Sequence, residues 1–171
     1  MAVLVRDEII KLIKQKKLSI TPFNKKHIGP ASIDFHLGNK FRVFKRVEKP
    51  LLIKSPHDDY QKITKVIQAK DTITILPGES IHGITQESIK LPNNICGWIQ
   101  GRSSFARIGL MVHITANFIH PGHSGKQVLE MTNAGPVPLA IPIGTAICQI
   151  ILEETKGEAK YRGKFYKQES P

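Results

Sequence analysis

Residues 95–132 read ICGWIQGRSSFARIGLMVHITANFIHPGHSGKQVLEMT. Short apolar runs at 95–100, 113–119 and 126–132 are separated here by polar or glycine-containing segments, among them Pro121-Gly122. β-Branched residues fit pleated strands, whereas Gly and Pro fit turns. The stretch therefore predicts three short β-strands.

The same pattern continues on both sides of this stretch. Further short strands are predicted at 71–76, 81–85 and 146–153. From Ser32, apolar residues alternate with polar ones around a Gly38-Asn39 turn, so residues 32–43 predict a hairpin. Residues 6–14 instead place isoleucines at helical spacing behind two acidic residues, which predicts one amphipathic helix. Short strands at this spacing predict an all-β fold, mainly β with short helices, built as a closed barrel or a double sheet.

The length of the chain limits the number of domains. With 171 residues and 40% hydrophobic composition, one compact domain is expected. We assign residues 1–155 to this domain and residues 156–171, which are polar and basic, to a tail that is either disordered or ordered on a ligand. Residues 45–70 carry charges without a clear period, which indicates a loop insertion or irregular strands.

The formal net charge of +11 favours an anionic partner: nucleic acid, an acidic membrane face or a polyphosphate. Many of the lysines are scattered without interleaved aromatics, which favours a solvated surface over a nucleic-acid groove. No apolar run approaches eighteen residues and no signal peptide is evident, so we expect a cytoplasmic protein that binds neither membrane nor nucleic acid. Cys96 and Cys148 lie in apolar strand patterns, which predicts buried, inert thiols.

The segment after Gly101 carries groups that bind phosphate. Arg102, Ser103 and Ser104 are consecutive, and Arg107 follows Ser103 by four residues, so in a short helix Ser103 and Arg107 share a face. A helix N-terminus with hydroxyls, free N–H groups and an arginine is suited to phosphate. The alternative is that Ser103 or Ser104 simply caps the helix.

Glu130 is the candidate catalytic acid or base. In KQVLEMTN, residues 126–133, it shares one face of the predicted strand with Val128 and Thr132, while Leu129 and Met131 point to the other. A glutamate on a strand is more often exposed to solvent. If this face lines a pocket, partial burial would raise the pKa of the carboxyl toward neutrality, where it could exchange protons with water and a leaving group.

A catalytic zinc ion is not expected. His120 and His123 offer two imidazoles, but the chain has no Cys-x-x-Cys, His-x-Glu or Pro-Cys sequence. The two histidines are interpreted as exposed residues of a turn.

Taken together, these motifs resemble the dCTP deaminase branch of the dUTPase superfamily over nearly the whole chain. The N-terminal helix with Pro30-Ala31-Ser32 and Asp34 resembles that branch's first signature. GRSSFARIGLMVHITA resembles its phosphate motif and pocket strand, PGHSGKQVLEMTN its catalytic hairpin, and YRGKFYKQES a shortened form of its C-terminal lid.

The resemblance implies a distorted, dUTPase-like β-barrel assembled as a homotrimer, with active sites at subunit interfaces. Glu130 would activate water for attack on C4 of the cytosine of dCTP, and magnesium would be bound through the triphosphate. The residues that it implies for substrate binding are Arg102, Ser103, Ser104, Arg107, which would come from a neighbouring subunit, Thr115 and Ala116, which would border the base, and His120, Tyr161, Lys164 and Gln168.

Two departures from the family pattern keep a second reaction open. His120 stands where the family commonly has an aspartate that contacts the deoxyribose and, in members that hydrolyse dUTP, helps to position water. Phe118 stands where bacterial monofunctional deaminases tend to have arginine, and an aromatic there resembles bifunctional or dUTPase-like members. Deamination of dCTP is the first hypothesis, dUTP hydrolysis to dUMP, alone or coupled to deamination, is the second, and a non-catalytic nucleotide-binding or nucleic-acid-binding barrel is the third.

Overall fold

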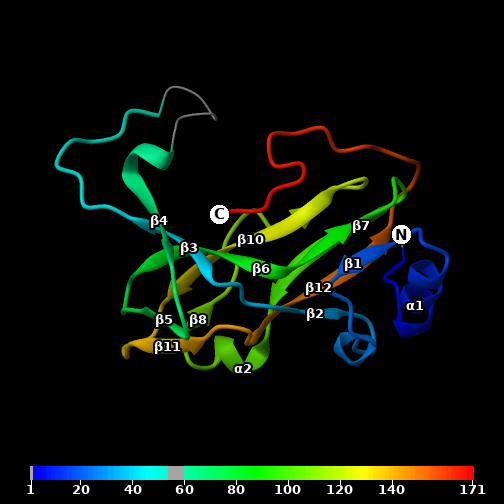
Figure 1. The fold of residues 1–171 in the computed structure, drawn as a ribbon, viewed down its shortest axis with the longest axis horizontal. Coiled ribbons are helices and arrows are strands. Elements are labelled where there is room, and N and C mark those ends of the chain that lie inside the picture. The colour runs from blue at the N-terminus through cyan, green and yellow to red at the C-terminus, as the bar shows by residue number, and fades with distance from the viewer. Residues whose placement is uncertain (1, 54–59) are drawn as a thin grey trace.

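The structure is a computed structural model and describes residues 2–53 and 60–171. Its helical elements are α1 (Arg6–Lys14), η1 (Lys25–His27), η2 (Tyr60–Ile63) and α2 (Ser103–Ala106). Its strands are β1 (Ser19–Thr21), β2 (Ile33–His36), β3 (Lys40–Phe44), β4 (Thr64–Gln68), β5 (Thr72–Ile75), β6 (Ser80–Lys90), β7 (Ile95–Gly101), β8 (Leu110–Met111), β9 (Phe118–Ile119), β10 (Ser124–Asn133), β11 (Leu139–Pro142) and β12 (Ala146–Glu154). The predicted mainly-β fold with short helices is confirmed (Figure 1).

In the described part of the chain, the strands form three antiparallel sheets. The largest has the order β4-β3-β6-β10-β8, with β1 also paired to β6. A second sheet has the order β2-β12-β7-β9, and β11 pairs with β5 in a third. Helix α1 lies at one end of the molecule, and the C-terminal tail runs along the edge opposite α2 (Figure 1).

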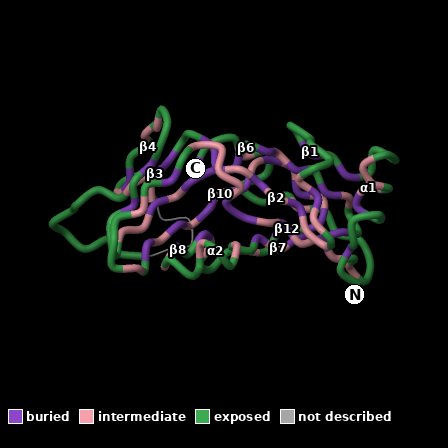
Figure 2. Tube along the Cα trace, turned by 90° about the horizontal axis from the view of Figure 1, so that it is seen from below, coloured by how far each residue is buried: buried purple, intermediate pink, exposed green. Residues whose placement is uncertain are grey.

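Strand β10 follows the predicted alternation over its whole length. Leu129 and Met131 are fully buried, whereas Val128, Glu130 and Thr132 are half-buried. The core that these residues join also contains the fully buried Phe35 and Phe41, among other apolar residues. Buried positions follow the strands, and residues 45–53 after β3 are exposed (Figure 2). The packing of one face of β10 therefore fixes which side chains the other face presents.

The predicted hairpin at 32–43 is wrong. Strand β2 pairs with β12, and β3 pairs with β4 and β6, so the two strands belong to different sheets. At the crossing, the Gly38 N–H donates to Ile84 O at 2.7 Å. A Cβ atom at Gly38 would lie only 2.7 Å from the same oxygen, so glycine is required there for close approach rather than for a hairpin turn.

The predicted strand at 113–119 is also largely wrong, because only Phe118–Ile119 forms a strand and Leu110–Met111 forms another before it. Between them, Thr115 donates to the Glu130 side chain through its main-chain N and its hydroxyl, and His113 accepts from the Glu130 main-chain N, so the segment continues no ladder. Helix α1 matches its predicted residues 6–14. Of the region 45–70, the described part contains η2 and β4, and residues 54–59 lie outside the described residues.

Candidate active site

Glu130 lies in the middle of β10, opposite His82 of β6 in the register of the two strands. Its Oε2 accepts hydrogen bonds from the main-chain N and from Oγ1 of Thr115, both at 2.9 Å. The side chain is half-buried, so the alternative of a fully solvent-facing glutamate does not hold. The carboxylate is held in one position by donors from the 112–117 segment.

The pKa of Glu130 is lower than its ordinary value, contrary to the sequence-based expectation. Burial raises the pKa of this carboxyl, as expected, but two Thr115 hydrogen bonds, the nearby His113 and an Ala116 backbone hydrogen bond together outweigh it. Hydrogen bonds to the charged form stabilise that form. Glu130 is therefore ionised at neutral pH and can accept a proton.

Glu130 faces a cavity of about 460 Å³. The cavity is lined by residues of several strands and of the C-terminal tail: Tyr60, His82, Ile99, His113, Ala116, Phe118, Ile119, His120, His123, Lys126, Gln127, Val128, Glu130, Tyr161, Phe165, Gln168 and Pro171. Of the predicted site residues, the structure thus brings Ala116, His120, Tyr161 and Gln168 together around Glu130. Thr115 joins them through its hydrogen bonds.

Three further histidines, His82, His113 and His123, line the same cavity. The Glu130 N–H donates to Nδ1 of His113 at 3.3 Å, so the ring proton of His113 is on Nε2, which is buried and has no hydrogen-bond partner among the described residues. Burial lowers the pKa of His82, with Arg42 and His113 adding to that effect and Glu130 opposing it. Burial and the neighbouring His120 lower the pKa of His123. His82 and His123 are therefore neutral near pH 7.

His120 is part of a stack of rings at the rim of the cavity. Its ring is parallel to that of Tyr161, with centroids 5.1 Å apart and an interplanar angle of 4°. It also meets Phe118 edge-on, with centroids 4.8 Å apart, and Phe118 in turn contacts Trp98 at 4.8 Å. His120, which lies between β9 and β10, thus contacts the tail through Tyr161.

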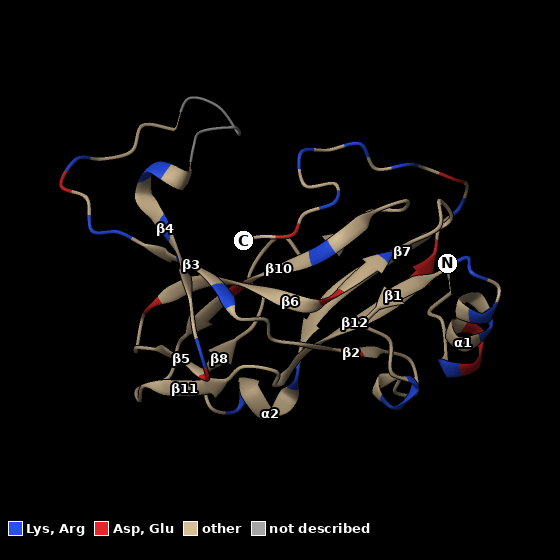
Figure 3. Ribbon diagram, viewed as in Figure 1, with Lys and Arg blue, Asp and Glu red and all other residues tan. Residues whose placement is uncertain are grey.

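The tail lies against β10 through main-chain hydrogen bonds. Lys167 N donates to Ser124 O at 2.6 Å, and Lys126 N donates to Gln168 O at 3.0 Å. A Cβ atom at Gly125, whose φ is +139°, would lie 2.8 Å from Gln168 N, so this glycine permits the close approach. Several lysines and arginines follow the tail above the strands (Figure 3). Lys164 is exposed near the rings of Tyr60 and Phe165 and does not line the cavity.

The predicted phosphate-binding residues are on α2 and its ends, and none of them lines the cavity. Arg102 is the N-cap of α2, which has no side-chain cap, so capping by Ser103 or Ser104 is not observed. Nη1 of Arg102 contacts Asp34 Oδ2 at 3.3 Å and Ala146 O at 3.2 Å. Both serines and Arg107 are exposed. A single chain therefore does not join these groups to the Glu130 cavity.

Comparison with known proteins identifies the family. The family model described as dCTP deaminase-like matches residues 3–155. The chain belongs to the dCTP deaminase-like family. It is 40% identical over 161 residues to the dCTP deaminase of Marinomonas sp. (strain MWYL1), with 89% of this chain and 83% of the relative covered. It is 36% identical over 156 residues to the dCTP deaminase, dUMP-forming, of Methanosphaera stadtmanae, with 90% and 79% covered.

A solved structure supports the same fold for this family member. The 2'-deoxycytidine 5'-triphosphate deaminase from Agrobacterium tumefaciens superposes with a TM-score of 0.69 at 20% identity. The match covers 88% of this chain and 47% of that chain, so the present chain spans about half its length. The predicted mainly-β fold is thus also the fold of a solved deaminase.

Several cavity residues of this dCTP deaminase-like chain were not predicted from its sequence. His113 is close enough to Thr115 in sequence to have been considered, but His82, Gln127 and Tyr60 come from elements whose register the sequence does not give. The prediction of buried cysteines is confirmed, and burial raises the pKa of both thiols. Within residues 2–53 and 60–171, no helix has the length and apolar composition needed to cross a bilayer.

Proposed function

We propose that this chain catalyses the hydrolytic deamination of dCTP to dUTP and ammonia. The observation that carries the proposal is the Glu130 carboxylate, kept ionised by Thr115 and facing a cavity large enough for part of a nucleotide. Membership of the dCTP deaminase-like family supports it. The names of two relatives, both called dCTP deaminases and 36–40% identical in sequence to this chain, support it as well.

The proposed chemistry is general acid–base catalysis by Glu130. The carboxylate takes a proton from water as the water oxygen adds to C4 of the cytosine ring, and it returns that proton to N3. A second proton then passes from the new C4 hydroxyl to the amino group, which leaves as ammonia while the carbonyl forms. His113 Nε2, a buried donor without a partner among the described residues, is available to the base or the water.

The triphosphate requires groups that the cavity of one chain lacks. Among the side chains of its described lining residues, Glu130 is the one acid, and Lys126 is the one cation other than histidine. We propose that Arg102, Ser103, Ser104 and Arg107 of a second copy supply the phosphate contacts in a homotrimer. Magnesium would be held mainly by phosphate oxygens, as is usual for nucleotides, since Glu130 is already occupied by Thr115. Its role would be to neutralise phosphate charge.

A second candidate is the further hydrolysis of dUTP to dUMP and pyrophosphate. It is favoured by similarity to a relative named dUMP-forming and by Phe118 in the cavity wall. His120 opposes it, because an imidazole packed between Phe118 and Tyr161 is not the carboxylate that positions water in dUTP-hydrolysing members.

One product assay separates these reactions. The purified protein is incubated with dCTP and with dUTP in the presence of Mg²⁺, and ammonia and pyrophosphate are measured together. Deamination alone gives ammonia from dCTP and no pyrophosphate from either nucleotide. Pyrophosphate from dCTP or dUTP would support the second candidate, and nucleotide binding without either product would leave a non-catalytic binding protein.

Replacing Thr115 with valine should move the acid limb of the activity profile to higher pH. The substitution removes the hydroxyl donor to the Glu130 carboxylate, so the lowered pKa of Glu130 rises toward its usual value. In the wild type, the ionised Glu130 also stabilises the folded protein. This stabilisation is present above the pKa that Glu130 has in the unfolded chain, and it is lost as the pH falls through the pKa that Glu130 has in the folded chain. The measurement is kcat/KM against pH, which reports the free enzyme.

Thr132→Val is the matched control for this variant. Thr132 is on the same face of β10, but its hydroxyl bonds to Ser80 at 2.6 Å and not to Glu130. Its acid limb should stay at the wild-type position. If Thr115→Val and Thr132→Val gave the same profile, Thr115 would not control the ionisation of the reacting group.

Deleting residues 160–171 should reduce kcat/KM by at least about tenfold, because side chains of this segment form part of the cavity wall and we expect the tail to close over bound substrate. We expect the tail to be more mobile without nucleotide than with it. The melting temperature should fall only modestly, since most side chains of the tail are exposed and the lost contacts are mainly its main-chain hydrogen bonds to β10 and the Arg42–Pro171 bond. A large fall in melting temperature would instead assign the tail a structural role.

A further inference from the structure

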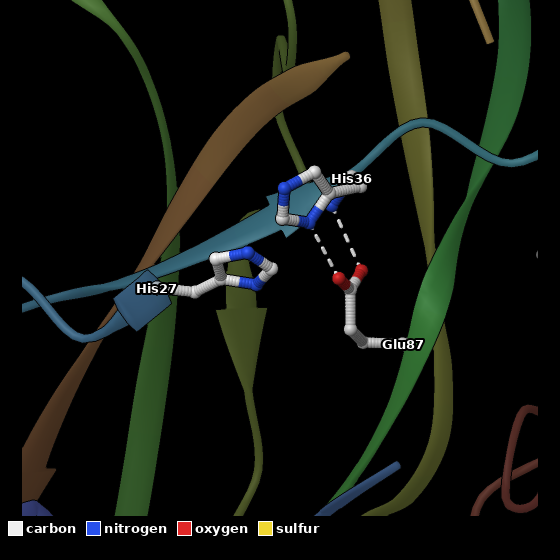
Figure 4. A group of neighbouring side chains, drawn as sticks. All are labelled: His27, His36 and Glu87. Atoms are coloured by element: carbon white, nitrogen blue, oxygen red, sulfur yellow. Dashed lines mark hydrogen bonds and ion pairs between the residues drawn. The ribbon is translucent and has the colours of Figure 1, made fainter. Parts of the chain in front are cut away.

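A second cluster of polar side chains lies outside the candidate active site. His27 at the end of η1, His36 at the end of β2 and Glu87 of β6 converge from three elements (Figure 4). One possible ligand atom from each residue lies within 4.8 Å of the other two. None of the three lines the cavity that Glu130 faces. The cluster is therefore unexplained by the proposed reaction.

Glu87 is a buried carboxylate whose orientation is already fixed. Only 4% of the residue is exposed. Its Oε2 accepts from the main-chain N of His36 at 2.8 Å, and its Oε1 lies 2.6 Å from Nδ1 of the same residue. Thr85 Oγ1 donates to the Glu87 main-chain oxygen at 2.7 Å. A buried charge needs such partners, and here they also hold the carboxylate ready as a ligand.

His27 brings a second imidazole to the same place. The centroids of its ring and that of His36 are 4.3 Å apart. Its position follows from the start of η1, where Asn24 Oδ1 accepts from Lys26 N at 3.0 Å. Two imidazoles this close repel one another when both are protonated, whereas two neutral rings can share one cation. Lys25 and Lys26 precede His27 but are exposed, so solvent screens their charge.

We propose that His27, His36 and Glu87 bind a transition-metal ion of the Zn²⁺ class. Two imidazole nitrogens and one carboxylate are a donor set that suits zinc and its neighbours rather than magnesium or calcium. The ion would replace the proton shared by His36 and Glu87. Zinc–ligand bonds of about 2.1 Å put the donor atoms of a tetrahedral site about 3.4 Å apart. Nδ1 of His36 and Oε1 of Glu87, which lie 2.6 Å apart, would therefore separate slightly, and the nitrogen of His27 on its short surface helix would move closer to them.

The role of such an ion would be structural. Strand β2 belongs to the sheet that contains β12, whereas β6 belongs to the largest sheet, so the ion would link the two sheets to η1. The donors also differ from the His120–His123 pair considered in the sequence. In the part of the chain that the structure describes, neither of those histidines belongs to a group of three possible ligands.

The test is a titration of Zn²⁺ into the full-length, chelator-treated protein, followed by calorimetry or by competition with a chromophoric chelator. We expect about one tight site per chain and a rise in melting temperature with zinc. His27→Ala should weaken zinc binding by at least about tenfold and abolish the thermal shift. His27 is partly exposed, so this variant should fold, unlike a variant of the buried Glu87.

His120→Ala is the matched control, since it removes a histidine from the other cluster and should leave zinc affinity unchanged. Equal zinc affinity in the wild type and His27→Ala would overturn the proposal and leave His36–Glu87 as a simple ion pair. Loss of zinc binding in His120→Ala but not in His27→Ala would place the ion in the cavity instead. Neither readout depends on catalytic activity, so this proposal and the proposed deamination can fail separately.

Discussion

Glu130→Gln should abolish ammonia release from dCTP, with a loss in kcat of about 10³-fold or more, the upper range for general acid–base catalysis. Glutamine has nearly the shape of glutamate but cannot accept the proton of the attacking water. Nucleotide affinity should be largely retained, because the phosphate contacts are assigned to other residues. Ammonia release in a coupled assay gives the rate, and equilibrium titration with dCTP gives the affinity.

Glu154→Gln serves as the control for the same chemical change. Glu154 is exposed at the end of β12 and does not line the cavity, so its variant should turn over at the wild-type rate. Undiminished turnover in Glu130→Gln would remove Glu130 from the reaction. Loss of both binding and turnover, with a lowered melting temperature, would point to a structural defect and would be checked with Glu130→Asp.

Mixing two impaired variants should restore activity if each site is shared between chains. Arg107→Ala removes an exposed arginine next to α2 and should lower kcat/KM by roughly 10- to 100-fold, the range expected for one charge-assisted contact to phosphate. When Glu130→Gln and Arg107→Ala chains assemble at random in a closed ring, about a quarter of the sites receive both intact residues. Co-expression and activity measurement on the purified mixed oligomer test this.

The control for complementation is each variant assembled alone, which contains no fully intact site. If mixed oligomers were demonstrated by differently tagged chains and showed no recovered activity, Glu130 and Arg107 would act in the same chain or not in the same site. A protein that stayed monomeric in solution would contradict the shared site directly, since the cavity of one chain includes none of the α2 residues.

Most of the fold follows from local sequence patterns. The helix at 6–14 and the alternation in β10 were predicted because helical spacing and period two are local properties. The hairpin at 32–43 was wrong because Gly38 serves a sheet crossing, which is decided by the distant Ile84 and not by its neighbours. The strand at 113–119 failed for a related reason, since Thr115 bonds to Glu130, fifteen residues away, rather than to a ladder partner.

The lining of the cavity was predicted in part. Glu130, Ala116, His120, Tyr161 and Gln168 do line one cavity, and they were named through motifs that resemble the family. The pKa of Glu130 was expected to rise from burial alone. The opposing effect of the Thr115 hydrogen bonds depends on a loop conformation that no local pattern gives. His82 is opposite Glu130 only because of the β6–β10 register.

Because side chains alternate along β10, the number of residues that precede Glu130 in this strand decides which side chain faces the cavity. Successive side chains of a strand point to opposite faces. Deleting one residue between Lys126 and Glu130 would therefore turn Leu129 toward the cavity and the Glu130 carboxylate toward the apolar core. Such a deletion leaves Glu130 in the sequence, yet it would put an apolar side chain where the carboxylate now faces the cavity. Insertions and deletions should therefore be tolerated in the exposed connection at 45–53 of this chain, but not in β10.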